Sequence, residues 1–179
     1  MEIDRARIER VVRDVIGEVD EAGPVERPDS PRGPIALGAD HGGFALKEML
    51  KRYLTDELGY RVLDVGTTND ASCDYPDYAA KVARAVASRE CWRGIMIDGA
   101  GIGSSMAANR VPGVLAACCH NVATAVNSRE HNNANVLTLG SGVVGRGLAR
   151  QMVRIWLTTE FGGERHERRV RKILELEER

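Results

Sequence analysis

A short apolar run that ends on a carboxylate and passes into a glycine-rich turn is the feature that most constrains the fold. Residues 95–97 read Ile-Met-Ile, Asp98 follows, and glycines stand at positions 99, 101 and 103 before a run of small residues. Such a pattern is typical of a buried strand that turns tightly into a helix. Glycine also lets the backbone approach a ligand closely, so the turn is a candidate binding loop.

The rest of the sequence from residue 34 onward alternates between strand-like and helix-like patterns. We expect strands at 35–38, 60–65, 95–98, 113–119 and 135–139, and helices at 43–54, 77–87, after 103, and at 122–130, 144–159 and 165–178. Repeated strand–helix units imply parallel strands whose connecting helices cover both faces of the sheet. We therefore predict an α/β domain over residues 34–179, with a Rossmann-like, doubly wound, five-stranded parallel sheet.

The first 33 residues differ from this pattern. Residues 1–17 place aliphatic side chains on one face of an expected amphipathic helix: Ile8, Val11, Val12, Val15 and Ile16. Residues 18–33 are polar and rich in proline without periodicity, which is typical of a flexible linker. The helix could serve as a separate binding segment on this linker. Alternatively, it could pack on its own domain or pair with a copy of itself.

Charge and cysteine usage exclude several classes of protein. The net charge of −1 provides no overall field that favours nucleic acid or an acidic membrane surface. No apolar run reaches the length of a membrane span, and no signal peptide is recognisable. The four cysteines lack metal-ligand spacing, which is typical of a reduced, cytoplasmic protein.

Asp98 and the loop that follows it suggest a specific chemistry. A carboxylate beside a loop of backbone amides supplies a base and hydrogen-bond donors for an enolate oxygen, as proton abstraction next to a carbonyl requires. The spacing Gly-x-Gly-x-Gly differs from the dinucleotide fingerprint, and no acidic residue stands in residues 115–119, about 20 positions on. A tight turn with glycines needed only for packing is the alternative.

Other polar segments add candidates at the expected strand and helix ends. Asp40 and His41 directly follow the first strand, where the carboxyl ends of parallel strands form ligand sites. Tyr75 ends the loop after the second strand and could bind a hydroxyl group or simply pack. Asp40 as a helix cap beside an exposed His41 is the plainer interpretation of the first pair.

Two further segments lie near helix ends in the second half of the chain. His131 and Asn132 belong to a run of polar residues before an apolar strand, which suits a hydroxylated ligand and a proton shuttle. Arg165 and Arg169 are four residues apart on one expected helix face, a spacing that suits a phosphate. A solvated charged face is the alternative for the arginine pair.

Taken together, these segments resemble the type B ribose-5-phosphate isomerases and their galactose-6-phosphate isomerase relatives. The resemblance extends from Ile35 to about Ile173. It rests on motifs at 38–44, Lys47, 65–67, 74–76, 99–103, 107–109, 131–136, 140–145 and 165–170. It implies metal-free, cofactor-independent aldose–ketose isomerisation through a cis-enediolate. It also implies a homodimer whose active sites draw on both subunits, with tetramers in some members.

The resemblance assigns a role to each candidate residue by position. His41, Arg165 and Arg169 would hold the phosphate, and His131 would help to open the furanose ring. Substrate hydroxyls would contact Asp40, Tyr75 and Asn132. The backbone of the loop would stabilise the enediolate through Gly99, Gly101, Ile102 and Gly103.

This chain departs from the family pattern at the positions that supply the catalytic base. Many members carry Cys at the position of Asp98, and another branch uses Glu at the position of Ser104. Ala100 replaces a Thr or Ser, and Gly142 stands where one branch has a phosphate-binding Arg. Asp98 is then the proton acceptor that remains on the loop, and an aspartate is ionised at pH 7 without assistance.

The substrate and the location stay open at this point. Ribose 5-phosphate is favoured because His131 is present, while tetrose or hexose phosphates and a non-catalytic sugar-phosphate binder are the alternatives. Residues 1–17 resemble the encapsulation peptides of bacterial microcompartment cargo enzymes, which implies shell proteins as partners of a cytoplasmic enzyme.

Overall fold

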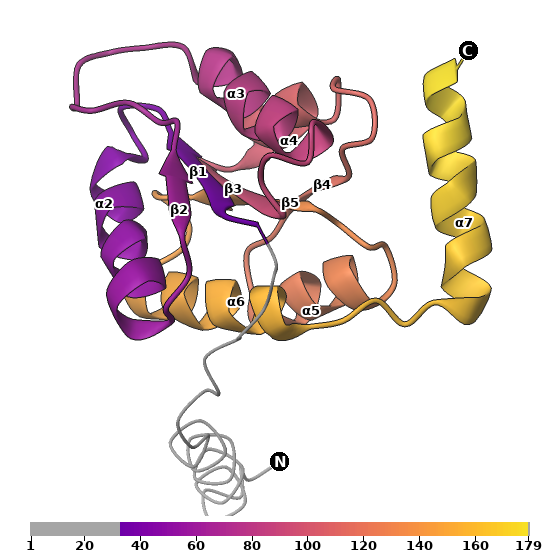
Figure 1. Ribbon diagram of the computed structural model, residues 1–179. Coiled ribbons are helices and arrows are strands. Elements are labelled where there is room, and N and C mark those ends of the chain that lie inside the picture. The colour runs from indigo at the N-terminus through magenta and orange to yellow at the C-terminus, as the bar shows by residue number, and fades with distance from the viewer. Residues whose placement is uncertain (1–32, 179) are drawn as a thin grey trace, which may run out of the picture. The chain divides into compact units, whose positions relative to one another are not determined.

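The computed structural model describes residues 33–178 (Figure 1). The chain divides into two units, Met1–Ser30 and Pro31–Arg179. The helix expected at 1–17 and all but the last residue of the linker expected at 18–33 lie outside the described residues.

A five-stranded parallel sheet forms the centre of the α/β domain. The strands are β1 (Ile35–Ala39), β2 (Val62–Asp64), β3 (Arg93–Asp98), β4 (Ala116–Cys118) and β5 (Val136–Gly140). Their order is β2-β1-β3-β5-β4, and β1 pairs with β3 from Ile35↔Arg93 to Ala39↔Ile97. The predicted doubly wound parallel sheet is confirmed.

Helices cover both faces of the sheet (Figure 1). One layer contains α2 (Phe44–Arg52), α5 (Val122–Glu130) and α6 (Arg146–Thr158), and the other contains α3 (Tyr75–Ala87) and α4 (Ile102–Ala108). Alternation along β1 explains the two cores, because Ile35 and Leu37 pack toward the first layer while Ala36 packs toward α3.

The C-terminal helix α7 (Glu164–Leu174) stands apart from the sheet and continues as a 3-10 turn, η2 (Glu175–Glu178) (Figure 1). Its sequence is dominated by charged residues, and of its apolar side chains Val170 is buried while Ile173 is exposed. No helix within the described part of the chain combines the length and apolar character that a membrane span requires.

Most predicted elements differ from the structure by a few residues at their ends, and two of the differences have a clear local cause. The helix expected at 43–54 ends its α-helical part at Arg52 and continues as a π-helical turn, η1 (Tyr53–Glu57), in which the Leu58 amide donates to the Tyr53 carbonyl. The strand expected at 113–119 is shorter, because Gly113 has a φ of 78° and makes a turn before β4.

Candidate active site

The first group of candidate residues lies at the carboxyl ends of β1 and β3, where the strand order reverses. Open parallel sheets bind ligands at this position, since the connections leave in opposite directions. Asp40 follows β1, and Asp98 ends β3. The Ser141 amide, after β5, donates to the Asp98 carbonyl at 2.8 Å, and the Gly142 amide donates to the Gly99 carbonyl at 3.0 Å. Three strand ends are therefore joined at one edge.

The Asp98 side chain organises the loop that follows it. Its carboxylate is 5% exposed, and Oδ1 accepts hydrogen bonds from the amides of Ala100, at 2.8 Å, and Gly101. Oδ2 accepts from the Ser104 amide at 3.0 Å and from the Ser104 hydroxyl at 2.5 Å. The carboxylate therefore caps the first turn of α4, and the Gly101 amide, which we expected to face an enediolate, donates to Asp98.

Two glycines of the loop are required by its geometry. Gly101 has a φ of 80°, and a Cβ there would lie 3.0 Å from the Leu139 carbonyl carbon. A Cβ on Gly103 would lie 2.6 Å from the ring of Tyr75, so that ring packs directly over the start of α4. The structure thus brings Tyr75 to the same loop as Asp98.

Asp40 and His41 lie beside this loop. The Asp40 Oδ1 accepts from the Gly43 amide at 2.9 Å, and the side chain is almost fully buried. His41 is exposed, and its Nδ1 lies 3.2 Å from both the amide nitrogen and the carbonyl oxygen of Cys73. Cys73 therefore holds the His41 ring, a contact across 32 residues for which the sequence offers no signal.

Ser141 is, after Cys73, a second residue whose contact at the site was not predicted from the sequence. Its Oγ donates to the Gly42 carbonyl at 2.8 Å and joins the loop after β5 to the turn after β1. Its place directly after a strand end was the available signal, since polar residues at that edge face the ligand site.

The second group of candidates forms its own cluster around the end of α5. The rings of His131 and His166 stack with centroids 4.2 Å apart, and the Asn127 amide lies 2.8 Å from the His131 Nδ1. The Asn132 side chain donates to the Asn127 carbonyl at 3.2 Å. Arg165 donates from Nε to the His166 Nε2 at 3.3 Å. Partial desolvation and the neighbouring His131 and Arg165 lower the pKa of His166.

The arginine pair lies on the first turns of α7. Both guanidinium groups are exposed, and Arg169 donates to the Arg165 carbonyl at 3.1 Å. Because His131 stacks on His166, the arginines lie on the same helix as a residue that contacts the end of α5. These contacts bring His131 and the start of α7 into one part of the fold, whereas His41, which the family resemblance groups with Arg165 and Arg169 at the phosphate, lies with the first group of candidates.

Within one chain, the two groups lie at opposite ends of the parallel strands. Helix α5 begins after the carboxyl end of β4 and runs back, so His131 and Asn132 precede the amino end of β5. Asp98 and Gly140 pair at the carboxyl ends of β3 and β5. At roughly 3.3 Å per residue, the length of β5 alone separates the two ends by about 13 Å.

A groove of about 730 Å³ follows the exposed β4 edge of the sheet. Its lining includes Asn109 from the end of α4, Ala116 from β4, Asn132, and Ile173 and Leu176 from the C-terminal helical segment. Leu176 is 64% exposed. Among residues 33–178, no group of three or more His, Cys, Asp and Glu side chains is arranged to hold a metal ion.

Comparisons with known proteins agree with this architecture. The family described as Ribose/Galactose Isomerase matches residues 35–173. Ribose-5-phosphate isomerase B of Escherichia coli is 46% identical over 145 residues, which are 81% of this chain and 97% of that protein. Galactose-6-phosphate isomerase subunit LacA 1 of Streptococcus pyogenes is 40% identical over 136 residues, covering 76% of this chain and 94% of that subunit.

A solved structure extends the likeness to the fold. The structure of Clostridium thermocellum ribose-5-phosphate isomerase B superposes with a TM-score of 0.80 at 52% sequence identity. The superposition covers 81% of this chain and 97% of the Clostridium chain.

Proposed function

The chain belongs to the ribose/galactose isomerase family, and we propose that it interconverts ribose 5-phosphate and ribulose 5-phosphate through a cis-enediolate. The enzyme class, an aldose–ketose isomerase that acts on a sugar phosphate, follows from the family. The observation that carries the proposal is the buried Asp98 carboxylate inside a glycine loop, beside Asp40 and His41 at the strand-order reversal.

In the proposed reaction, the Asp98 carboxylate removes the C2 proton of the open-chain aldose. The electron pair of the broken C–H bond forms the enediolate double bond, and the negative charge develops on the carbonyl oxygen. The proton of the C2 hydroxyl then moves to O1, and return of a proton from Asp98, which can exchange with solvent, to C1 leaves the C2 carbonyl of the ketose. Backbone donors of Gly99, Ile102 and Gly103 lie on the loop where this charge would form, and fixed donors of this kind stabilise a developing oxyanion.

Asp98 can accept a proton only if one of its hydrogen-bonded lone pairs is freed. A carboxylate has about four acceptor positions, and Asp98 accepts four hydrogen bonds. Of these donors, the Ser104 hydroxyl is the one that can rotate without moving the backbone. We therefore infer that rotation of this hydroxyl frees Oδ2 when substrate binds.

A second copy of the chain would complete the site. The phosphate-binding candidates Arg165 and Arg169 and the ring-opening candidate His131 lie at the opposite edge of the sheet from Asp98. If two copies packed against each other across the β4 groove, Arg165 and Arg169 of one copy would approach the Asp98 loop of the other. The exposed apolar side chains Ile173 and Leu176 beside that groove support a homodimer.

Direct assay of a panel of tetrose, pentose and hexose phosphates tests this proposal. We expect the highest kcat/KM with ribose 5-phosphate, and exchange of its C2 proton with D₂O observed by NMR. A clear preference for galactose 6-phosphate would place the chain with its LacA relatives instead. Failure to exchange the C2 proton of every sugar phosphate would support the non-catalytic binder.

For residues 1–17, which lie outside the described residues, we propose a targeting role in the cytoplasm. The support is the sequence alone: an aliphatic stripe joined to a proline-rich segment. A fluorescent protein fused to residues 1–20 should enter a co-expressed microcompartment shell, and deletion of residues 1–30 should leave turnover intact. Diffuse fluorescence, or loss of the folded enzyme on deletion, would contradict this role.

A further inference from the structure

A buried lysine lies behind the candidate site without any part in the proposed chemistry. Lys47, on α2, is 1% exposed, and its Nζ lies 2.7 Å from the Asp64 Oδ2 and 2.7 Å from the Glu48 Oε1. The ammonium also lies 5.5 Å from the centroid of the Phe44 ring. Lysine is almost never fully buried unless it is paired, because loss of hydration is costly. An apolar side chain would pack here more easily, so the charge requires an explanation.

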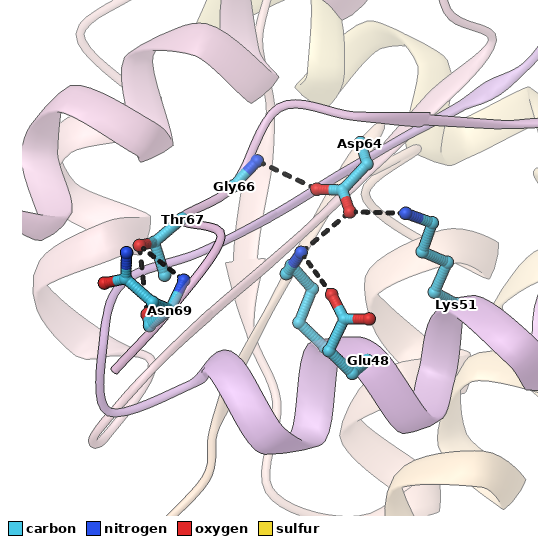
Figure 2. A network of polar contacts seen from close by, with 7 residues as sticks. Glu48, Lys51, Asp64, Gly66, Thr67 and Asn69 are labelled. Carbon is cyan, nitrogen blue, oxygen red and sulfur yellow. Dashed lines mark hydrogen bonds and ion pairs between the residues drawn. The ribbon is translucent and has the colours of Figure 1, made fainter. Parts of the chain in front are cut away.

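Asp64 joins this lysine to the loop that follows β2. Figure 2 shows its carboxylate between Lys51 on α2 and the Gly66 amide. Oδ2 accepts from Lys51 at 2.9 Å as well as from Lys47, and Oδ1 accepts from Gly66 at 3.1 Å. Burial alone would raise the pKa of Asp64, but the two lysines and the Gly66 amide together outweigh it and lower that pKa. The ionised carboxylate therefore connects helix α2 to the root of the loop.

The root of the loop is packed against both Lys47 and β1. A Cβ on Gly66 would lie 2.7 Å from the Lys47 Cδ and 2.6 Å from the Ala39 amide nitrogen, so no larger residue fits between them. The next amide, of Thr67, donates to the Ala39 carbonyl at 2.9 Å. Lys47 thus contacts the loop through its aliphatic stem as well as through its charge.

The far end of the same loop holds His41. Cys73 contacts the His41 Nδ1 through its backbone, and His41 itself precedes α2 by three residues. The two segments on either side of the His41 ring, α2 and the loop from residue 65 to 74, are therefore the two segments that Lys47 and Asp64 connect.

We propose that Lys47 is a positioning residue, whose ion pair with Asp64 fixes this loop relative to α2 and so holds His41 where it binds the substrate phosphate. The inference rests on the proposed function, which gives His41 that role. Lys47 does not touch substrate, because it is buried beneath the loop. Lys51 donates to the same oxygen atom from the surface, where it is 41% exposed and its contribution is screened by water.

Lys51 therefore provides a matched control. Lys47→Met keeps the unbranched apolar stem of the side chain and removes the buried ammonium, while Lys51→Met removes the exposed one. At a temperature where circular dichroism shows both variants fully folded, we expect Lys47→Met to raise KM for ribose 5-phosphate at least tenfold. Its kcat should stay within threefold of the wild type. Lys51→Met should change both constants less than twofold. An unchanged KM in folded Lys47→Met would overturn the proposal.

A second measurement does not depend on turnover. The ring resonances of His41, assigned with a His41→Gln variant, can be followed by NMR during titration with inorganic phosphate. In Lys47→Met we expect a displaced His41 resonance and phosphate affinity at least tenfold weaker, whereas Lys51→Met should match the wild type. If the wild type isomerises no sugar phosphate but these changes occur, the proposed function fails and the positioning role stands.

Asp64→Asn covers the case in which Lys47→Met does not fold. Asparagine keeps the shape and an acceptor oxygen for Gly66, but it removes one of the two negative charges that pair with Lys47, the one that belongs to the loop side. We expect at least a threefold rise in KM and the same direction of change at the His41 resonance. An undisturbed His41 resonance together with wild-type phosphate affinity in this variant would also overturn the proposal.

Discussion

The two halves of the candidate site are built in opposite ways. At the strand ends, Asp40 and Asp98 are 6% and 5% exposed, and backbone amides hold both carboxylates. At the other edge of the sheet, Arg165 and Arg169 are exposed on a helix that stands apart from the sheet (Figure 1). The first half holds its carboxylates in fixed positions within one chain, whereas the second half presents its cations to solvent.

This difference suggests how the work is divided. Groups that stabilise a transition state are most effective when they are fixed in advance, since no reorganisation is then needed during the reaction. Charged groups that attract a phosphate have to remain accessible until it arrives, and in the proposed function they suit an exposed position that a second copy would cover. The first predictions below alter one half at a time, and a later one combines a defect in each half.

The largest effect should come from the fixed half. Asp98→Asn removes the proposed base, and loss of general-base catalysis typically lowers kcat by about 10²- to 10⁴-fold. Substrate binding, followed by calorimetry, should persist because the phosphate-binding half is unchanged. Steady-state kinetics provides the test, and a near-normal kcat would show that Asp98 is not the base.

Ser104→Ala is the control for the structural role of Asp98. It removes one of the four hydrogen bonds to the carboxylate while the carboxylate and the backbone donors stay. We expect kcat to change by less than about tenfold, because in the proposed reaction this hydroxyl has already rotated away from Oδ2 when the proton is removed. A loss as large as that of Asp98→Asn would mean that loop order, rather than basicity, is what the aspartate supplies.

The exposed half should affect binding instead. Arg169→Ala removes a charge-assisted contact to phosphate of roughly 1.5–3 kcal/mol, so KM for the sugar phosphate should rise tenfold or more. Thermal stability should hardly change because the side chain is exposed. Arg168→Ala, which removes a neighbouring exposed arginine from α7, should leave KM within about twofold, as is usual for an exposed charge away from a site. Equal KM values for the two variants would exclude Arg169 from the phosphate site.

Mixing the two defects tests whether the halves meet between chains. A heterodimer of Asp98→Asn and Arg169→Ala subunits contains one site with both wild-type residues if each site is shared. Random re-association should then recover about a quarter of wild-type activity, because half of the dimers are mixed and each has one intact site. Absence of recovery would place both residues in one subunit's site.

Sequence reasoning succeeded better for the fixed half than for the exposed half. Asp40 and Asp98 could be placed together because parallel strands bring their carboxyl ends to one side of the sheet, whereas Tyr75 was assigned to the site only through the family resemblance. The capping of α4 by Asp98 could not be foreseen, since it depends on the left-handed Gly101. Contacts between distant segments, such as His41 with Cys73 and His131 with His166, have no local pattern to reveal them.

Contacts between distant segments also explain why the strand predicted at 113–119 is shorter in the structure. Residues 113–115 are apolar enough to extend β4, but the Leu115 amide donates to the Asn135 side chain at 2.8 Å and not to a neighbouring strand. The Ala116 amide likewise donates to the Asn109 side chain at 2.8 Å. Side-chain amides thus satisfy the backbone at the start of this edge strand, and apolarity alone cannot indicate that.

The smallest expected effects are on how the thermal stability depends on pH. The two halves should respond in different pH ranges. The pKa of Asp64 is lowered in the folded state, so the ionised carboxylate stabilises the fold at neutral pH. That contribution is present above the unfolded value of about 3.9 and is lost as the pH falls through the lower folded value. Asp64→Asn should therefore flatten the loss of Tm below about pH 4 and should not affect its slope between pH 5 and 7.

The histidine stack should respond in a higher window. The pKa of His166 is lowered by desolvation and by His131 and Arg165, so the folded state disfavours its protonation. Its contribution is present above the unfolded value of about 6.5 and declines as the pH falls below it, and His166→Gln should remove that decline. Thermal unfolding followed at half-unit steps from pH 7.5 to 3 resolves both windows. If Asp64→Asn altered the upper window, or His166→Gln the lower, the fixed strand-end half and the exposed helical half would be coupled rather than independent.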